Sequence, residues 1–343
     1  MKATVLGANG YAGMLLLRIL ARHPHITRIA ASSRSLAGVA LEEADPGLFT
    51  SRSGGGPFEA TVSAPEDALK DPGEVVFSAL PHGASATVCA PILGSVPVVD
   101  LSADFRFDDL QRFRDAYDAD APLPEFQKSA VYGLSEWYRG RIAGAKLIAN
   151  PGCYPTATLL PLLPIAREGL IAGTVVVNAL SGISGAGRTE KRNLLFAERS
   201  ENANAYSVGT RHRHGAEIAE KLDRAGGAMS HTILFNPHLV PIKQGMAVTT
   251  VVPTDSPRHA VEALRSAWGD EPFVECTGEV PPESRHVRGT NRIRIGWREE
   301  AGCLILMSVI DNLWKGASGQ AVQNMNILFS LPETSGLEYG TEL

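Results

Sequence analysis

The hydrophobic residues in the first half of the chain form short runs that alternate with helix-like segments. Apolar runs that predict buried strands lie at residues 3–6, 26–31, 75–80 and 96–101. A Leu- and Ile-rich segment at residues 12–22 predicts a helix, which Pro24 helps to end. Three consecutive glycines within residues 52–57 predict a loop. The alternation is typical of a doubly wound α/β domain, which we expect over residues 1–150.

Beyond residue 174, strand-like runs follow one another with fewer helical segments between them. They lie at residues 175–180, 232–235 and 246–252, and a further pair at 292–296 and 303–310 predicts two strands across a turn. This pattern predicts a second domain, over residues 151–312, built on a mixed or antiparallel sheet. A last helix near residues 316–328 is expected to have one apolar face, formed by Ala321, Met325 and Leu328. We expect its segment, residues 313–343, to pack back on the first domain.

The composition narrows the class of protein without naming a chemistry. A length of 343 residues suits two domains, and 44% hydrophobic with 20% charged residues is ordinary for a soluble globular protein. The net charge of −5 argues against nucleic-acid binding, and no apolar run approaches the roughly 18 residues needed to span a membrane. No signal peptide is expected, because the first residues run directly into a strand. Four widely spaced cysteines without a metal-ligand rhythm predict free thiols in a reducing cytoplasm and no bound metal.

A glycine-rich turn, residues 7–13 (GANGYAG), lies between the first predicted strand and the first predicted helix. Small residues there let the backbone approach a pyrophosphate, and the helix N-terminus offers N–H donors and a favourable dipole. The spacing is GxxGxxG, with Asn9 in the middle, instead of GxGxxG. The strand–turn–helix context predicts a dinucleotide site, with a tight turn that binds no ligand as the alternative.

The end of the second predicted strand decides which dinucleotide is expected. Folds that bind NAD usually place an Asp or Glu about 20 residues after the glycines, on the ribose hydroxyls. This chain has Ser33, Arg34 and Ser35 there and no carboxylate. Hydroxyls and a guanidinium suit a 2′-phosphate, so the sequence predicts NADP(H). The alternative is that Arg34 caps a solvated strand end.

Cys153 lies in the motif NPGCYPT (residues 150–156), between a turn and the predicted start of a helix. Pro151 and Gly152 favour the turn, and Pro155 suits the first turn of a helix. The thiol would then lie at the positive end of the helix dipole, where the thiolate is favoured. We expect a nucleophilic thiol, with a buried, inert cysteine as the alternative. The remaining cysteines lie in apolar contexts that predict core packing: Cys89, Cys276 and Cys303.

Groups able to assist such a thiol lie at residues 210–217 (TRHRHGAE). His212 and His214 titrate near neutrality and can exchange a thiol proton, and Glu217 is placed to orient an imidazole. The alternative is a solvated helix entry with scattered charges. Arg106 follows a strand end, where open α/β sheets gather ligand groups, so it is a candidate for a substrate anion; a surface ion pair is equally consistent. Residues 181–188 (SGISGAGR) predict a second backbone-exposing loop, or a plain one.

Seven motifs, in this order, resemble those of the N-acetyl-gamma-glutamyl-phosphate reductases in their full-length, type 1-like form. They are residues 7–13, 79–83 (ALPHG), 100–106 (DLSADFR), 150–156, 181–187, 212–214 and 310–316 (IDNLWKG). The resemblance covers nearly the whole chain, and the cysteine and paired-histidine motifs are specific. One departure is Arg211, where relatives often carry an aliphatic residue. Its charge is expected to alter the local pKa or to contact a substrate anion.

By this resemblance the fold is a Rossmann-type NADP-binding domain followed by an α+β dimerisation and catalytic domain of the aspartate-semialdehyde dehydrogenase kind. The resemblance makes Cys153 the nucleophile and His212, in preference to His214, the acid/base group, with Glu217 in support. We expect Arg106, Asn150, Ser181 and Arg211 to bind the substrate. The resemblance assigns cofactor binding to Gly7, Asn9, Gly10, Tyr11, Ala12, Gly13, Ser33, Arg34, Ser35, Leu80, Pro81, His82, Ser184, Gly185, Ala186, Gly187 and Asn312.

The implied reaction is the NADPH-dependent reductive dephosphorylation of N-acetyl-L-glutamyl 5-phosphate to the 5-semialdehyde and inorganic phosphate, through a cysteine thioester. The resemblance further implies a cytoplasmic enzyme of arginine biosynthesis, either homotetrameric or homodimeric. Two alternatives are a carrier-protein-linked aminoadipyl-phosphate reductase of lysine biosynthesis and an aspartate-semialdehyde dehydrogenase. Residues 154–156, Tyr-Pro-Thr, favour the N-acetylglutamyl substrate over both. A non-catalytic NADP-binding regulator is a third alternative, although such a protein would not need the thiol and the histidines.

Overall fold

The chain forms two compact units in the computed structural model, which describes residues 1–48, 56–226 and 232–337. The first unit comprises Met1–Leu110, Asp120–Pro151 and the C-terminal segment that begins at Ala317, and the second comprises Gln111–Ala119 and Gly152–Gly316. Most of the expected glycine loop, residues 52–55, and the last residues of the 313–343 segment lie outside the described part. Within the described part, no helix is long and apolar enough to cross a membrane. Nor do three His, Cys, Asp or Glu side chains gather there as metal ligands.

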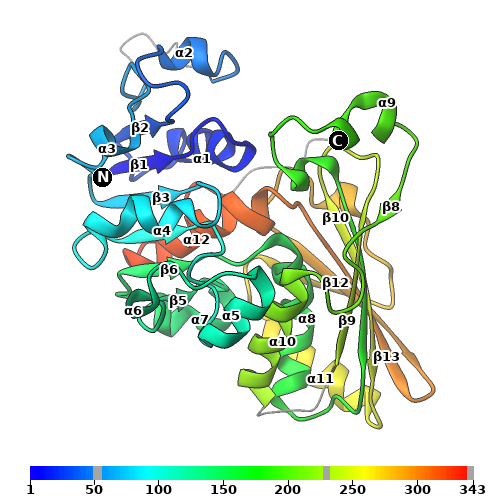
Figure 1. Cartoon of the computed structure of the whole chain (residues 1–343). Coiled ribbons are helices and arrows are strands. Elements are labelled where there is room, and N and C mark those ends of the chain that lie inside the picture. Colours follow the sequence, from blue (N-terminus) through cyan, green and yellow to red (C-terminus); the bar gives the residue numbers. More distant parts are fainter. Residues whose placement is uncertain (49–55, 227–231, 338–343) are drawn as a thin grey trace. The chain divides into compact units, whose positions relative to one another are not determined.

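The first unit is built on six parallel strands in the order β2-β1-β3-β4-β6-β5 (Figure 1). The strands are β1 (Lys2–Leu6), β2 (Arg28–Ser32), β3 (Val75–Ser78), β4 (Val98–Asp100), β5 (Val131–Tyr132) and β6 (Leu147–Ala149). All four residues of β3 are buried, as expected for a parallel strand covered on both faces. The strand order reverses between β1 and β3, and ligands bind at the carboxyl ends of strands that flank such a point.

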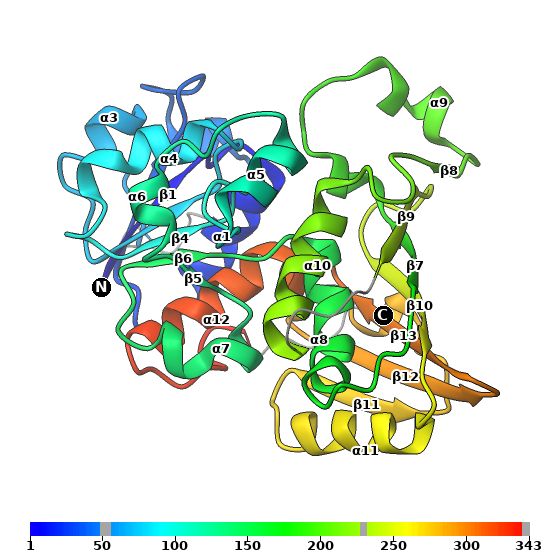
Figure 2. The ribbon, with the colours of Figure 1, turned by 60° about the horizontal axis from the view of Figure 1, so that its bottom comes forward.

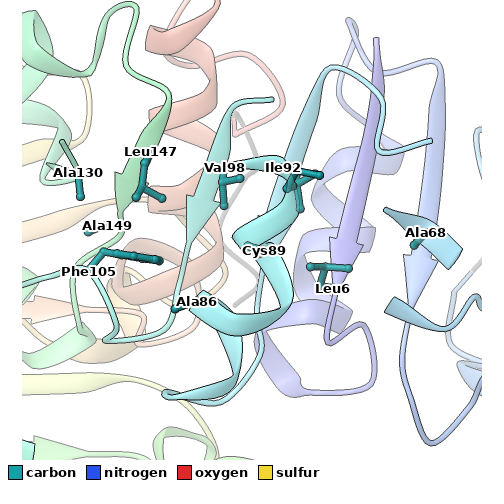
Figure 3. Packing of buried hydrophobic residues seen from close by; sticks show 11 residues of the cluster. Leu6, Ala68, Ala86, Cys89, Ile92, Val98, Phe105, Ala130, Leu147 and Ala149 are labelled. Atoms are coloured by element: carbon teal, nitrogen blue, oxygen red, sulfur yellow. The ribbon is translucent and has the colours of Figure 1, made fainter. Parts of the chain in front are cut away.

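Short helices and one apolar cluster complete the first unit. The helices are α1 (Tyr11–Ala21), α2 (Leu41–Ala44), α3 (Pro65–Ala68), α4 (Ala84–Cys89), η1 (Ala90–Ile92), α6 (Pro124–Gln127), α7 (Ser135–Ile142) and α12 (Gly319–Leu328). Figure 3 shows the cluster, whose members are Leu6, Ala68, Val76, Ala86, Cys89, Ile92, Val98, Phe105, Ala130, Leu147 and Ala149. Cys89 is fully buried, and burial raises the pKa of its thiol to about 12. The predicted packing role of this cysteine is confirmed.

Helix α12 differs from its predicted one-sided form. Ala321 and Met325 are buried as expected, but the amide side chains around the helix are buried too. The amides are paired: Gln320 and Asn324 both donate to the carbonyl of Gly133, at 2.9 and 2.8 Å. The expectation of a single apolar face was wrong, because a hydrophobic pattern cannot show that buried amides find partners elsewhere in the chain.

The second unit is built on a seven-stranded mixed sheet in the order β11-β12-β13-β10-β7-β9-β8 (Figure 2). The strands are β7 (Val175–Ser181), β8 (Asn204–Ala205), β9 (Ile233–Leu239), β10 (Met246–Pro253), β11 (Val274–Gly278), β12 (Ile293–Glu300) and β13 (Cys303–Ile310). Strands β12 and β13 form the predicted antiparallel pair, with Ile293 opposite Ile310. Strands β7 and β9 are parallel, which makes the sheet mixed. The predicted change of architecture after the first domain is confirmed.

Helices cover one face of this sheet and leave the other open. The helical segments of the unit are α5 (Leu110–Tyr117), α8 (Cys153–Arg167), η2 (Ile183–Ala186), η3 (Arg192–Leu194), α9 (Phe196–Arg199), α10 (Arg213–Gly226), α11 (Pro257–Trp268), η4 (Ser284–His286) and the π-helical η5 (Trp314–Ser318). Helices α8, α10 and α11 pack on the sheet (Figure 2). On the opposite face, Val176, Val251 and Ile305 lie side by side and are half-buried. With Leu180, which is 43% exposed, they form what we call the open apolar face, although the exposed Asn178 and Thr249 lie between them.

Candidate active site

Cys153 is the first residue of α8, with Gly152 as its extended N-cap. The helix therefore begins where the sequence predicted, and Pro155 in its first turn has no N–H to satisfy. No side chain caps this end, so the backbone N–H groups of Cys153 and Tyr154 contribute to the positive end of the helix dipole. The thiol is half-buried. This is the environment in which proteins activate cysteine nucleophiles.

Aromatic rings and two imidazoles surround Tyr154, the residue next to Cys153. The Tyr154 hydroxyl lies 3.0 Å from that of Tyr206. The ring centres of His212 and His214 lie 5.9 and 5.8 Å from the Tyr154 ring and 4.9 Å from each other. Burial, and then the neighbouring Tyr206, raise the pKa of Tyr154, so its hydroxyl stays protonated. The fold thus brings both predicted histidines to the residue that follows the predicted nucleophile.

His212 is held as a neutral imidazole. Burial, and then the charge of Arg213, lower its pKa to about 4. The backbone N–H of His214 donates to Nδ1 of His212 at 3.1 Å, so the neutral ring carries its proton on Nε2. The ring also packs against Tyr206 and Phe235, with centre separations of 5.6 and 5.2 Å. At neutral pH, His212 is oriented to donate a hydrogen bond from Nε2.

The backbone around Cys153 is held from two sides. An oxygen of Glu217, fully buried on α10, accepts the N–H of Gly152 at 3.2 Å. The sequence suggested that Glu217 orients an imidazole; the contact seen here is with the turn that presents the thiol. On the other side lies Gly316 of η5, where an added Cβ would stand 2.7 Å from Cβ of Cys153. Real Cβ atoms essentially never approach so closely, so only glycine fits without displacing the cysteine.

The glycine turn of the first unit fits a dinucleotide phosphate. Gly7 has a φ of +75°, and a Cβ there would lie 2.6 Å from the carbonyl oxygen of Ala79. A Cβ at Gly13 would lie 2.2 Å from the carbonyl oxygen of Gly7. These two glycines therefore let the turn pack tightly on β3 and α1. Gly10, the N-cap of α1, is different: an added Cβ there would approach the carbonyl oxygen of Gly7 only to 3.5 Å, so the helix start is open to an anion.

The polar groups at the end of β2 suit the 2′-phosphate of NADP. The Asn9 amide donates to the Ser35 hydroxyl at 3.2 Å, and the hydroxyls of Ser33 and Ser35 lie 3.3 Å apart. Arg34 pairs with Glu66 at 2.8 Å, with both side chains mostly exposed. An exposed pair of this kind is weak, so a doubly charged phosphate can replace the carboxylate as the partner of Arg34. Hydroxyls and a guanidinium thus lie together where the sequence predicted them.

The remaining predicted cofactor residues lie in two separate turns. Leu80, Pro81 and His82 directly follow β3 in the first unit, and the backbone of Leu80 lies against the Gly7 position. In the second unit, the loop with Ser184, Gly185, Ala186 and Gly187 meets Asn312. The Asn312 amide donates to the Ser184 hydroxyl at 3.0 Å and accepts the N–H of Gly245 at 2.7 Å. The structure therefore joins Asn312 to the loop, although they are far apart in the sequence. Two further predicted cofactor residues, the exposed Tyr11 and its neighbour Ala12, are the first residues of helix α1.

Of the four predicted substrate residues, three are buried and one is exposed. Arg106 is buried, and it donates to the carbonyls of Asn150 and Leu101 at 2.9 and 2.8 Å, which rules out the alternative of a surface ion pair. Asn150 is buried as well and accepts a hydrogen bond from an amide of α12. Ser181 is buried at the end of β7. Arg211 is exposed and lines a cavity beside His212.

Sequence reasoning missed several residues of the thiol site. Tyr206 and Phe235 contact the His212 ring, but no motif marks either of them. Arg112 of α5 reaches the same region as Arg211. Gly316 belongs to a motif that only the family resemblance singles out. Tyr206 lies only six residues before His212, so a search for aromatic residues near the histidine cluster could have found it, whereas Phe235 and Gly316 lie too far along the chain for a local pattern.

Two family models match most of the chain. The NAD binding domain of semialdehyde dehydrogenases matches residues 2–145, and the semialdehyde dehydrogenase dimerisation domain matches residues 153–312. The chain is 42% identical over 343 residues to an N-acetyl-gamma-glutamyl-phosphate reductase of Dehalococcoides mccartyi, which covers 98% of this chain and 97% of that protein. It is 43% identical over 341 residues to the reductase of the same name from Halorhodospira halophila, covering 97% of each.

Solved structures share the fold at much lower identity. Aspartate semialdehyde dehydrogenase II from Vibrio cholerae matches with a TM-score of 0.72 and 19% identity, over 96% of this chain and 98% of that one. Aspartate semialdehyde dehydrogenase with NADP from Candida albicans matches with a TM-score of 0.66 and 18% identity, over 95% and 97%. These likenesses show that the two-unit architecture is that of the semialdehyde dehydrogenases, as the sequence predicted.

Proposed function

The chain belongs to the N-acetyl-gamma-glutamyl-phosphate reductase family, and we infer that it reduces N-acetyl-L-glutamyl 5-phosphate to N-acetyl-L-glutamate 5-semialdehyde with NADPH, in arginine biosynthesis. The inference is carried by Cys153, held at the start of α8 beside two histidines, in a chain that matches these relatives along nearly its whole length. The relatives' names do not favour the aminoadipyl-phosphate and aspartate-semialdehyde alternatives. Cys153, His212 and His214 are all present, which argues against a non-catalytic regulator, because such a protein would not need them.

The first half of the reaction belongs to Cys153. Its thiolate attacks the acyl carbon of the substrate, forming a C–S bond. The C–O bond to phosphate then breaks, and phosphate leaves with the electron pair, which yields a thioester on the cysteine. The N–H groups at the start of α8 and the Nε2 proton of His212 are the donors that we assign to the developing oxyanion.

The second half returns the thiol. When bound to the first domain, NADPH would supply the hydride that reduces the thioester carbon. The C–S bond of the resulting thiohemiacetal oxyanion breaks, the aldehyde forms, and Cys153 regains its negative charge. We assign His212 to this oxyanion as well. A neutral imidazole suits the step better than a permanent positive charge, because the oxyanion must become the carbonyl of the aldehyde. His214 and Glu217 keep His212 and the Cys153 turn in place.

The proposal assigns cofactor binding and catalysis to different domains. We assign NADP(H) to residues 1–150, held by the glycine turn, Ser33, Arg34, Ser35 and the turn after β3, and catalysis to residues 151–312. The family matches to residues 2–145 and 153–312 support this division. The Ser184–Asn312 pair is assigned to the cofactor as well. A cytoplasmic location is also proposed, supported by four cysteines that form no disulfide, one of which must stay reduced to act.

The assembly that we propose is a homodimer formed through the open apolar face of the seven-stranded sheet, with a homotetramer as the larger alternative. The match to a dimerisation domain, which includes strands β7, β10 and β13, supports it. Half-buried Val176, Val251 and Ile305 give that face the apolar character of a stable interface.

Replacing Cys153 tests the proposed chemistry. The Cys153→Ser variant should lose phosphate-dependent reduction of NADP+ by N-acetylglutamate semialdehyde roughly a thousandfold or more, because a serine hydroxyl is not ionised at neutral pH. NADP+ binding, measured by fluorescence titration, should be unchanged. Cys276→Ser, at a half-buried cysteine of β11, is the matched control and should keep its activity. Near-normal turnover of the Cys153 variant would contradict the mechanism.

The same assay distinguishes the substrates. Wild-type protein is offered N-acetylglutamate semialdehyde, carrier-bound aminoadipate semialdehyde and aspartate semialdehyde, each with phosphate and NADP+. The first should give the highest kcat/KM. A higher value for either of the others would reassign the function.

A further inference from the structure

A cavity of about 360 Å³ lies beside His212 in the second unit. Its walls come from α5 and from the segment that enters α10. Three guanidinium groups line it, those of Arg112, Arg211 and Arg213, against the single carboxylate of Asp115. We call it the arginine cavity. Its excess of positive charge favours an anionic ligand.

Two of the three guanidinium groups are held in position by neighbours. Arg112 donates to a carboxylate oxygen of Asp223 at 2.6 Å. The guanidinium of Arg213 lies 5.7 Å from the centre of the Tyr117 ring, a cation–π contact. The one lining carboxylate, Asp115, accepts a hydrogen bond from a glutamine amide at 2.7 Å. Groups fixed in this way lose less side-chain entropy when they bind a ligand.

The rest of the cavity wall suits an anion attached to a short carbon chain. Helix α10 has 14 residues and begins at Arg213, so its N-terminus adds a positive dipole to the arginine charges. The side chains of Ala116, Ala216 and Ala219 also line the cavity. They offer methyl groups against which methylene or acetyl groups can pack.

His212 connects the arginine cavity to the thiol site. It lines the cavity, and its ring packs against Tyr154, the residue next to Cys153, and against Tyr206. The described residues that line the cavity include none of the 150–156 segment. An anion held there would contact His212, whose ring also packs against the residue that follows the thiol.

We propose that the arginine cavity binds the α-carboxylate of the N-acetylglutamyl substrate and that Arg211 determines this specificity. The proposal rests on the function proposed above. The α-carboxylate lies four C–C bonds of about 1.5 Å from the reacting carbon, and tetrahedral bond angles make the end-to-end distance of that extended chain roughly 5 Å. The phosphate is bonded to the reacting carbon through one oxygen, so it must lie beside the thiol itself. Arg211 and Arg213 are both exposed, but the guanidinium of Arg213 packs on the Tyr117 ring and Arg112 pairs with Asp223. We therefore assign the carboxylate to Arg211, whose fork can bind it through two parallel hydrogen bonds.

The test compares two aldehydes that differ only in this carboxylate. N-acetylglutamate semialdehyde and 4-acetamidobutanal, its analogue without the α-carboxylate, are each assayed with phosphate and NADP+. The wild-type protein should prefer the first by roughly 100-fold or more in kcat/KM. In Arg211→Gln this preference should fall by roughly 10- to 100-fold, and Arg211→Lys should retain part of it. The ratio of the two values is the readout, because general damage to the site lowers both values together.

Three further results decide the proposal. Arg258→Gln, which removes an exposed charge from α11, is the matched control and should leave the ratio unchanged. An unchanged ratio in Arg211→Gln, with an active protein, overturns the proposal while the proposed function stands. A raised KM for phosphate with an unchanged ratio assigns the cavity to phosphate and also overturns it. Wild-type protein that is inactive on N-acetylglutamate semialdehyde overturns the proposed function, and this proposal with it.

Discussion

At the scale of single residues, the site depends on an imidazole that burial keeps uncharged. An exposed histidine has a pKa near 6.5, whereas burial and the charge of Arg213 lower that of His212 to about 4. The proximity of His212, His214 and Glu217 along the chain predicted a cluster around the thiol. Their sequence could not show which ring nitrogen accepts a hydrogen bond, because the N–H of His214 and the Nδ1 of His212 meet only in the folded turn.

The shifted pKa of His212 makes the stability of the protein depend on pH. Between about pH 6.5 and pH 4 the unfolded chain binds a proton at this residue and the folded chain does not. The free energy of unfolding should therefore fall as the pH is lowered through this window, by at most about 1.4 kcal/mol per pH unit from this one group. Urea unfolding at several pH values should show a smaller slope for His212→Gln than for wild-type protein.

The exposed His259 of α11 provides the control for this measurement. His259→Gln should keep the wild-type dependence of unfolding free energy on pH. Equal slopes for wild-type protein and His212→Gln would show that His212 titrates alike in the folded and unfolded chain, which a buried, neutral imidazole would not do.

At the scale of elements, the helix starts were the most predictable part of the site. Helix α8 begins at Cys153 and α1 directly after Gly10, as the turn residues and prolines indicated. Such starts depend on the conformations of neighbouring residues, so a local pattern predicts them. The π-helical turn η5 was not predicted, and we know of no local signal for it. It brings Gly316 against Cys153, and a π-helical turn at a functional site is a recurrent feature of proteins.

Enlarging Gly316 should move the nucleophile without removing it. In Gly316→Ala, the new Cβ would stand 2.7 Å from Cβ of Cys153, so the cysteine or η5 must shift by about an ångström. A misplacement of that size lowers kcat by roughly 10- to 100-fold. Steady-state kinetics should show this loss while Cys153 remains chemically present, as titration with a thiol reagent verifies.

Gly140→Ala is the matched substitution for this comparison. Gly140 lies on α7, and an added Cβ there meets no atom within 4 Å. Its kcat should equal that of the wild-type protein. A Gly316→Ala variant as active as Gly140→Ala would show that the contact at Cys153 does not constrain catalysis.

At the scale of the whole molecule, the open apolar face of the seven-stranded sheet is the surface through which we expect two copies of the chain to associate. Leu180 is 43% exposed on β7, and in the proposed dimer it would be buried. Leu180→Arg should place an unpaired charge in that interface and weaken association by roughly 100-fold or more. Size-exclusion chromatography with light scattering should then record a lower mass than for wild-type protein. The same experiment distinguishes a wild-type dimer from a tetramer.

Ser266→Arg controls for the added charge alone. Ser266 is exposed on α11, a helix that packs on the covered side of the sheet, so its replacement should leave the mass unchanged. A Leu180→Arg variant with the wild-type mass would show that the open face is not the association surface.

The sequence by itself determined the change from an alternating pattern to a strand-rich one, where the glycine turn lies and that Cys153 opens a helix. These features depend on residues a few positions apart, whose hydrophobic period and backbone preferences are local. Only the tertiary structure decided which groups surround the thiol and which arginines share a cavity. Tyr206, His212 and Gly316 reach Cys153 or its neighbour, and Arg112 reaches Arg211, from elements far apart along the chain. Such meetings follow from how sheets and helices pack, which no short stretch of sequence encodes.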